Sequence, residues 1–226
     1  HGISFMHEAV KNLPMDVFTM LPSCVPATPF ETSGFDLNSY DLSLLIDKPL
    51  VLGLAEMMNF PGVLNLDNNV MAKLELAKSK EKRIDGHAPY LNGKDLCAYV
   101  ASGVKSDHEC TTPEEAIERI RLGMYVMIRE GTAAKDLDAL LPVLKNCNTR
   151  KCIFVTDDRH PSDLKEHING MVRRAVEAGV DPIKAIQVAS LNTAEYFGLQ
   201  NLGAIAPGYK ADLLVLPDLK SFKPDI

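Results

Sequence analysis

Four residues of metal-ligating type follow short apolar runs in the middle of the chain: Glu56, His87, His108 and Asp157. They are separated by 31, 21 and 49 residues. Imidazole nitrogen and carboxylate oxygen are ligands that suit Zn, Fe or Mn. A divalent ion lowers the pKa of a bound water molecule, and a carboxylate beside it, such as Asp157, can carry the released proton. The set therefore predicts metal-assisted hydrolysis.

The stretches that must position these residues alternate between strand-like and helix-like patterns. The expected strands are 17–21, 50–56, 83–87, 104–109, 125–130 and 152–158, and the expected helices between them are 67–82, 93–102, 113–122 and 137–146. This alternation predicts an α/β fold with a parallel sheet. Chemistry in such folds gathers at the carboxyl ends of the strands, where Ser23 and Glu130 are two further polar residues.

The pattern changes after Asp158. Residues 164–178, 181–189 and 192–198 are expected to be helical, and 211–216 to form a strand. One strand–helix unit of a barrel takes about 20–30 residues, so Glu56, His87 and His108 are expected on successive strands. We predict a partial metal-dependent hydrolase barrel over residues 1–200 and the return strand of a small β domain over 201–226.

Composition narrows the classes of partner. The chain has 226 residues and a formal charge of −6, without a long basic run, which argues against nucleic-acid binding. No apolar run approaches the roughly 18–20 residues of a membrane span. The odd number of cysteines, the lack of a CxxC pair and the lack of a signal-like start favour a cytoplasmic setting. Because it begins at His1 and ends at Ile226, we expect the chain to be a piece of a longer one.

Strings around the candidate ligands resemble bacterial and archaeal adenine deaminases of the amidohydrolase superfamily. They are residues 53–63, 85–89, 106–109, 128–134, 155–161 and 203–212. The most specific are Glu-Met-Met-Asn-Phe-Pro-Gly at 56–62 and Thr-Asp-Asp-Arg-His-Pro at 156–161, and the likeness covers essentially the whole chain.

The resemblance implies a (β/α)₈ TIM-type barrel, of which strands three to eight are present, plus the start of a small β-sandwich domain. It implies a binuclear divalent metal centre, usually Mn or Fe with Zn as the alternative. It also implies hydrolysis of adenine to hypoxanthine and ammonia in purine salvage, by a cytoplasmic homo-oligomer, expected to be a dimer.

Roles carry over position by position. Glu56 resembles the ligand that bridges both metals, and His87 and His108 resemble ligands of the second metal. Asp157 resembles the aspartate of the eighth strand, which binds metal and shuttles protons. The resemblance also implies a proton-relay role for Glu109, and substrate contacts are expected from Asp158, Ser23 and His167.

Two other interpretations stay open. The first is another cyclic amide or amidine hydrolase of the superfamily, although such enzymes usually place a carboxylated lysine where Glu56 stands. The second is a catalytically inactive remnant, because the ligand pair of the family's first strand is not in this sequence. The retained ligand-type residues argue against the second interpretation.

Overall fold

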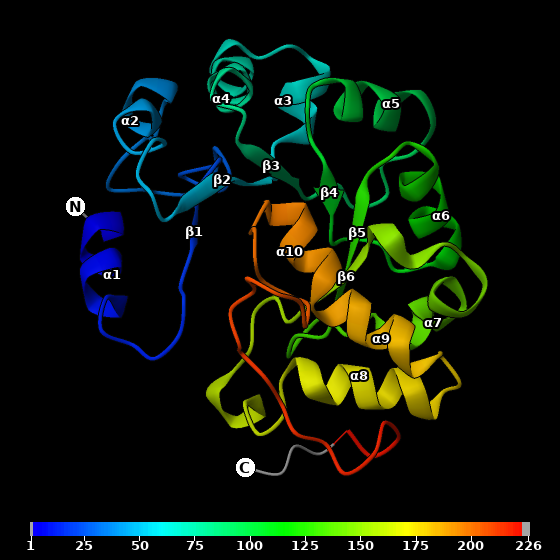
Figure 1. Cartoon of the computed structure of the whole chain (residues 1–226). Helices are drawn as coiled ribbons and strands as arrows, with labels where there is room; N and C mark the ends of the chain where they lie inside the picture. The colour runs from blue at the N-terminus through cyan, green and yellow to red at the C-terminus, as the bar shows by residue number, and fades with distance from the viewer. Residues whose placement is uncertain (1, 223–226) are drawn as a thin grey trace. The chain divides into compact units, whose positions relative to one another are not determined.

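The computed structural model describes residues 2–222 and divides them into two compact units. One contains the described residues within His1–His87 together with Ala98–Val104; the other contains Ala88–Cys97 and the described residues within Lys105–Ile226. Each unit is built on a sheet of three parallel strands, with orders β1-β2-β3 and β4-β5-β6 (Figure 1). The predicted α/β class with parallel strands is therefore confirmed.

The first unit places β2 at the centre of its sheet. Its elements are α1 (Gly2–Val10), β1 (Thr19–Leu21), α2 (Ser39–Ser43), β2 (Val51–Met57), α3 (Phe60–Leu64), α4 (Asn68–Ser79) and β3 (Arg83–Gly86). Helix α4 begins at Asp67, whose carboxylate accepts a hydrogen bond from the Val70 N–H, as helix starts prefer. The helix packs on β2 and β3 and buries Val70 and Leu74.

Close approach of β2 and β3 depends on Gly53. A Cβ atom at this position would overlap the carbonyl oxygen of Arg83 and lie 2.8 Å from Cε of Met20. Only glycine fits between the two neighbouring strands. This residue therefore sets the spacing of the strand that carries Glu56.

The second unit covers its sheet with helices. Its elements are the first part of α5 (Gly93–Ala101), β4 (Ser106–Asp107), α6 (Pro113–Arg121), β5 (Tyr125–Arg129), α7 (Leu137–Asn146), β6 (Cys152–Val155), α8 (Ile168–Glu177), α9 (Pro182–Ala189) and α10 (Leu191–Phe197). Helices α6 and α7 pack on β5, and α8, α9 and α10 pack on β6 (Figure 1). Apolar side chains of these helices and strands form one buried core cluster.

The start of α6 shows how local sequence fixes an element. Thr112 accepts from the backbone N–H of Glu115, and the Glu115 carboxylate accepts from the N–H of Thr112. This reciprocal capping box, with Pro113 in the first turn, satisfies backbone donors that a helix leaves without partners. The predicted helix start at Pro113 is confirmed.

The tail differs from the prediction. Residues 211–216 form no strand, and Val215 takes part only in a single bridge. Leu213 and Leu214 are 58% and 65% exposed. The expected strand is therefore wrong for the described residues, because an apolar run forms a strand only where a neighbour pairs with it. The last four residues of the predicted 201–226 unit lie outside the described residues, and the barrel numbering and the β-sandwich stay predictions.

Candidate metal and catalytic site

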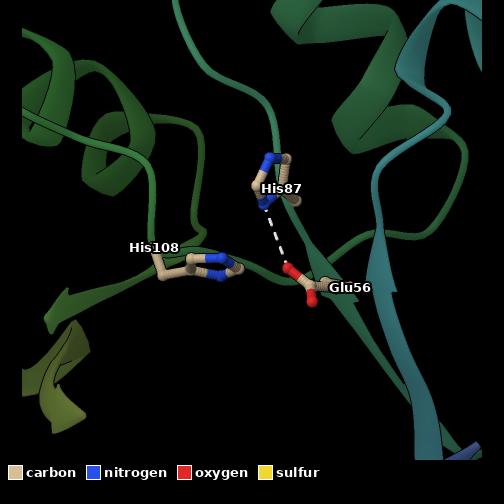
Figure 2. A group of neighbouring side chains, drawn as sticks. All are labelled: Glu56, His87 and His108. Carbon is tan, nitrogen blue, oxygen red and sulfur yellow. Dashed lines mark hydrogen bonds and ion pairs between the residues drawn. The ribbon is translucent and has the colours of Figure 1, made fainter. Parts of the chain in front are cut away.

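In the first unit, Glu56 and His87 lie side by side. Glu56 is the sixth residue of β2 and His87 directly follows β3. Nδ1 of His87 lies 3.0 Å from Oε2 of Glu56, within hydrogen-bond distance (Figure 2). Both side chains are partly exposed, 28% for His87 and 41% for Glu56. Parallel neighbouring strands thus bring together two residues that are 31 positions apart.

Tyr99 and Ser23 hold the backbone around this pair. The buried Tyr99 hydroxyl donates to the Met57 carbonyl at 2.7 Å and accepts from the His87 N–H at 3.1 Å. The hydroxyl of Ser23, which is also buried, donates to the carbonyl of Glu56. These side chains fix the carboxyl ends of β2 and β3. The pattern analysis missed Tyr99, because an aromatic residue in an apolar helix gives no sign of what its hydroxyl binds.

Ser23 is supported in turn by Lys73 of α4. The ammonium group donates to the Ser23 carbonyl at 2.8 Å, and Lys73 is only 5% exposed. Burial lowers the pKa of Lys73, against the opposing influence of Cys24 and Asp67. Ser23, expected to contact substrate, thus makes hydrogen bonds that hold its own strand end.

In the second unit, His108 lies between two carboxylates. It follows β4 and is 8% exposed. Its Nε2 atom lies 3.4 Å from Oε1 of Glu109 and 3.8 Å from Oδ1 of Asp157. The unit therefore brings together three of the residues singled out from the sequence, from the ends of β4 and β6.

Asp157 has an unusual backbone. Its φ angle is 53°, in the left-handed region that non-glycine residues seldom adopt and that Asp and Asn tolerate best. Asp158 continues this loop, and its carbonyl accepts from the N–H of Thr132 at 2.9 Å. A strained residue at a candidate catalytic position is consistent with a functional constraint.

An arginine network surrounds Glu109. Nη1 of Arg129, on β5, donates to the Glu109 carboxylate, and Nε of Arg129 donates to Asp136 at 2.6 Å. Burial acts to lower the pKa of Arg129, but its hydrogen bonds to Asp136 and Glu109 raise it above the usual value. Glu109 therefore faces a cation that stays charged. No sequence pattern indicates a role for Arg129 or Asp136.

Arg119 and Asp107 form a second buried ion pair in the second unit. Nε of Arg119 donates to Oδ2 of Asp107 at 2.8 Å, and both side chains are 0% exposed. Oδ1 of Asp107 accepts from the N–H of Ala88 at 3.2 Å and from that of Glu109 at 3.1 Å. Asp107 belongs to the resembling stretch 106–109, but no sequence pattern indicates its partners.

His167 lines a separate cavity of about 290 Å³ in the second unit. The other lining residues come from the loops after β5 and β6 and from α8, and include Glu130, Arg159 and Arg174. Glu130, expected among the reactive strand ends, instead pairs with Arg174 at 2.5 Å. Nε of Arg159 donates to the Glu130 carbonyl at 3.1 Å.

The cysteines divide by burial. Cys110 and Cys152 are buried, and burial raises the pKa of both thiols, that of Cys152 to about 12. Such thiols do not act as nucleophiles at neutral pH. Cys97, on α5, is exposed.

The donor set suits a divalent cation. Within the first unit, Glu56 and His87 offer a carboxylate oxygen and an imidazole nitrogen that lie close together, and within the second unit Asp157 and His108 do the same. Imidazole and carboxylate groups bind Zn, Mn and Fe, so the residues present fit a divalent metal but do not determine which one.

No described helix is both long enough and apolar enough to traverse a bilayer.

Comparison with known proteins extends these observations. The chain is 56% identical to an adenine deaminase of Desulfatibacillum aliphaticivorans and 54% identical to one of Clostridium acetobutylicum, in each case over 98% of this chain and 39% of the relative. It thus spans 39% of the length of these curated relatives. A solved structure, the β-aspartyl dipeptidase of Fervidobacterium islandicum AW-1, matches with a TM-score of 0.65 at 14% identity, over 98% of this chain and 65% of that one.

The match to the β-aspartyl dipeptidase structure shows the fold of the chain, which is the TIM-barrel fold of amidohydrolases. The model of the Amidohydrolase family matches residues 1–226, the whole length of the sequence. The chain therefore belongs to the amidohydrolase family.

Proposed function

We propose that the protein containing this chain hydrolyses adenine to hypoxanthine and ammonia. The observation that carries this proposal is the identity of about 50% with curated adenine deaminases over nearly the whole chain. The pairing of Glu56 with His87, and of His108 with Asp157, supports it, because each pair joins residues of metal-ligating type.

We propose that Glu56, His87, His108 and Asp157 hold a binuclear divalent centre, with Mn or Fe as the preferred metals. When bound, such a centre would lower the pKa of water and so supply a nucleophile near neutral pH. The residues offer imidazole nitrogens and carboxylate oxygens, which suit these ions. Their support by buried hydrogen-bonded groups favours a preorganised site.

The carboxylates of the second unit would handle the protons. The reaction adds water at C6 of adenine, protonates a ring nitrogen and releases the 6-amino group as ammonia. We propose that Asp157 accepts a proton from water and passes it to the leaving amino group. Glu109, held by Arg129, would exchange a proton with the purine ring. We propose substrate contacts for Asp158, Ser23 and His167.

Ammonia release from adenine tests the proposal. The complete protein, loaded with Mn or Fe, should release ammonia from adenine, and His108→Ala should abolish both turnover and tight metal binding. The exposed His160 lies outside the proposed ligand set, so His160→Ala serves as a control for the loss of metal.

The outcomes separate the alternatives. Tight metal binding without turnover of adenine would instead support another cyclic amidine substrate. Neither turnover nor metal binding would support an inactive remnant. Full activity of His108→Ala would overturn the metal assignment. A homodimer, a cytoplasmic location and the absence of nucleic-acid partners remain predictions, which sedimentation, cell fractionation and a DNA-binding assay would check.

A further inference from the structure

We infer that Asp107 and Arg119 are positioning residues that set the orientation of both candidate ligand histidines. The inference rests on the metal centre proposed above. It starts from the two oxygens of one buried carboxylate, which contact different parts of the chain. Oδ1 of Asp107 accepts from the N–H groups of Ala88 and Glu109, and Oδ2 accepts from Nε of Arg119.

The two backbone contacts flank the histidines. Ala88 directly follows His87, and His108 lies between Asp107 and Glu109. One carboxylate oxygen therefore holds the backbone immediately after each histidine. Two peptide units that are 21 positions apart thus share the same anchor.

Arg119 fixes the anchor itself. Besides its bond to Asp107, its Nη2 atom donates to the Ala88 carbonyl at 2.9 Å. The Arg119 guanidinium therefore donates hydrogen bonds both to the Asp107 carboxylate and to Ala88, whose N–H the same carboxylate accepts. A lysine could not make both contacts, because an ammonium group lacks the planar fork of donors.

A contribution to stability is a weak explanation for the presence of the buried Asp107–Arg119 ion pair. Both side chains are 0% exposed, and Nη1 of Arg119 has no hydrogen-bond partner among the described residues. Burying charges costs free energy that their attraction often fails to recover, and apolar residues of similar volume frequently stabilise as well or better. A fixed orientation of metal ligands is a benefit that apolar residues could not provide, because they offer no hydrogen bonds to the backbone.

The test compares two Arg-to-Lys changes in the complete protein. Arg119→Lys keeps the positive charge beside Asp107 but loses the fork. We expect Mn²⁺ affinity to fall about 10- to 100-fold, as is usual when groups that orient metal ligands are altered. The visible absorption of bound Co²⁺ should also change, because it reports ligand geometry. Arg174→Lys is the matched control, since Arg174 also pairs with a buried carboxylate, that of Glu130, and should leave both readouts unchanged.

The results have separate meanings. Unchanged Mn²⁺ affinity and an unchanged Co²⁺ spectrum in folded Arg119→Lys would overturn the positioning role. If Arg119→Lys does not fold, the neutral double variant Asp107→Asn with Arg119→Gln replaces it, and normal affinity there would overturn the inference equally. Failure of the unaltered protein to bind either ion would instead overturn the metal centre of the proposed function.

Discussion

Asp157 has a backbone conformation that restricts its replacement. Its left-handed φ suits Asn nearly as well as Asp, so Asp157→Asn should keep the free energy of unfolding within about 0.5 kcal/mol of the unaltered value. The lost carboxylate should lower kcat for adenine by at least about 100-fold, because the amide cannot carry a proton. Urea unfolding and ammonia release measure the two quantities. An active Asp157→Asn variant would contradict the proton role.

Asp157→Ala provides the comparison. Alanine tolerates this backbone poorly, so this variant should lose activity and also about 1 kcal/mol of stability. Equal stability of the Asn and Ala variants would show that the left-handed conformation carries little strain.

Lys73 gives the alkaline stability of the protein a distinctive pH dependence. Its pKa is lower in the folded state than in the unfolded state, so the unfolded chain binds more protons between these two values. The free energy of unfolding should therefore rise with pH across that interval, by up to about 1.4 kcal/mol per pH unit. Lys73→Met should remove this contribution. Urea titrations of both proteins at several alkaline pH values would check it; identical slopes would contradict it.

Single residues also mark the limit of sequence interpretation. Glu56, His87 and His108 were found because ligand types at strand ends form a recognisable series. Tyr99 and Arg119 were not found, because their roles arise from backbone groups that only the folded chain brings to them. A polar side chain on an otherwise apolar helix face was the one available signal for Arg119.

At the scale of elements, the spacing of β2 and β3 depends on Gly53. Gly53→Ala should destabilise the protein by about 3 kcal/mol or more, because its methyl group would overlap the backbone of Arg83. Metal affinity should fall with it, since Glu56 lies three residues further along β2. Gly34→Ala is the control, because its Cβ would meet nothing within 4 Å. Equal unfolding midpoints for the two variants would show that the strands separate without cost.

Periodicity predicted the longer elements well and the short ones poorly. Apolar runs between turn residues identified the strands and, from α4 onward, the helices of eight residues or more, and local caps such as Thr112 fixed their starts. Helices α2 and α3 have five residues each and were missed, because so few residues carry no period. The strand expected at 211–216 failed for another reason, since pairing depends on a partner rather than on the run itself.

At the scale of the whole molecule, metal binding should be linked to stability. The proposed centre, whose ligands Glu56, His87 and His108 are far apart in sequence, would exist only in the folded chain. A metal present at about 100 times its dissociation constant should add about 2.7 kcal/mol. For a chain of this size that corresponds to roughly 5–10 °C in Tm. A chelator should lower Tm by that amount and added Mn²⁺ should restore it; a Tm indifferent to both would contradict the centre.

The exposure of Cys97 has a practical consequence. The thiols of Cys110 and Cys152 are buried and protonated at neutral pH, whereas Cys97 lies at the surface of α5, two residues before Tyr99. With Cys24 and Cys147 replaced by serine, a maleimide dye would attach at this one position. The exposed surface of α5 thus offers a place for a fluorescent reporter on the folded chain.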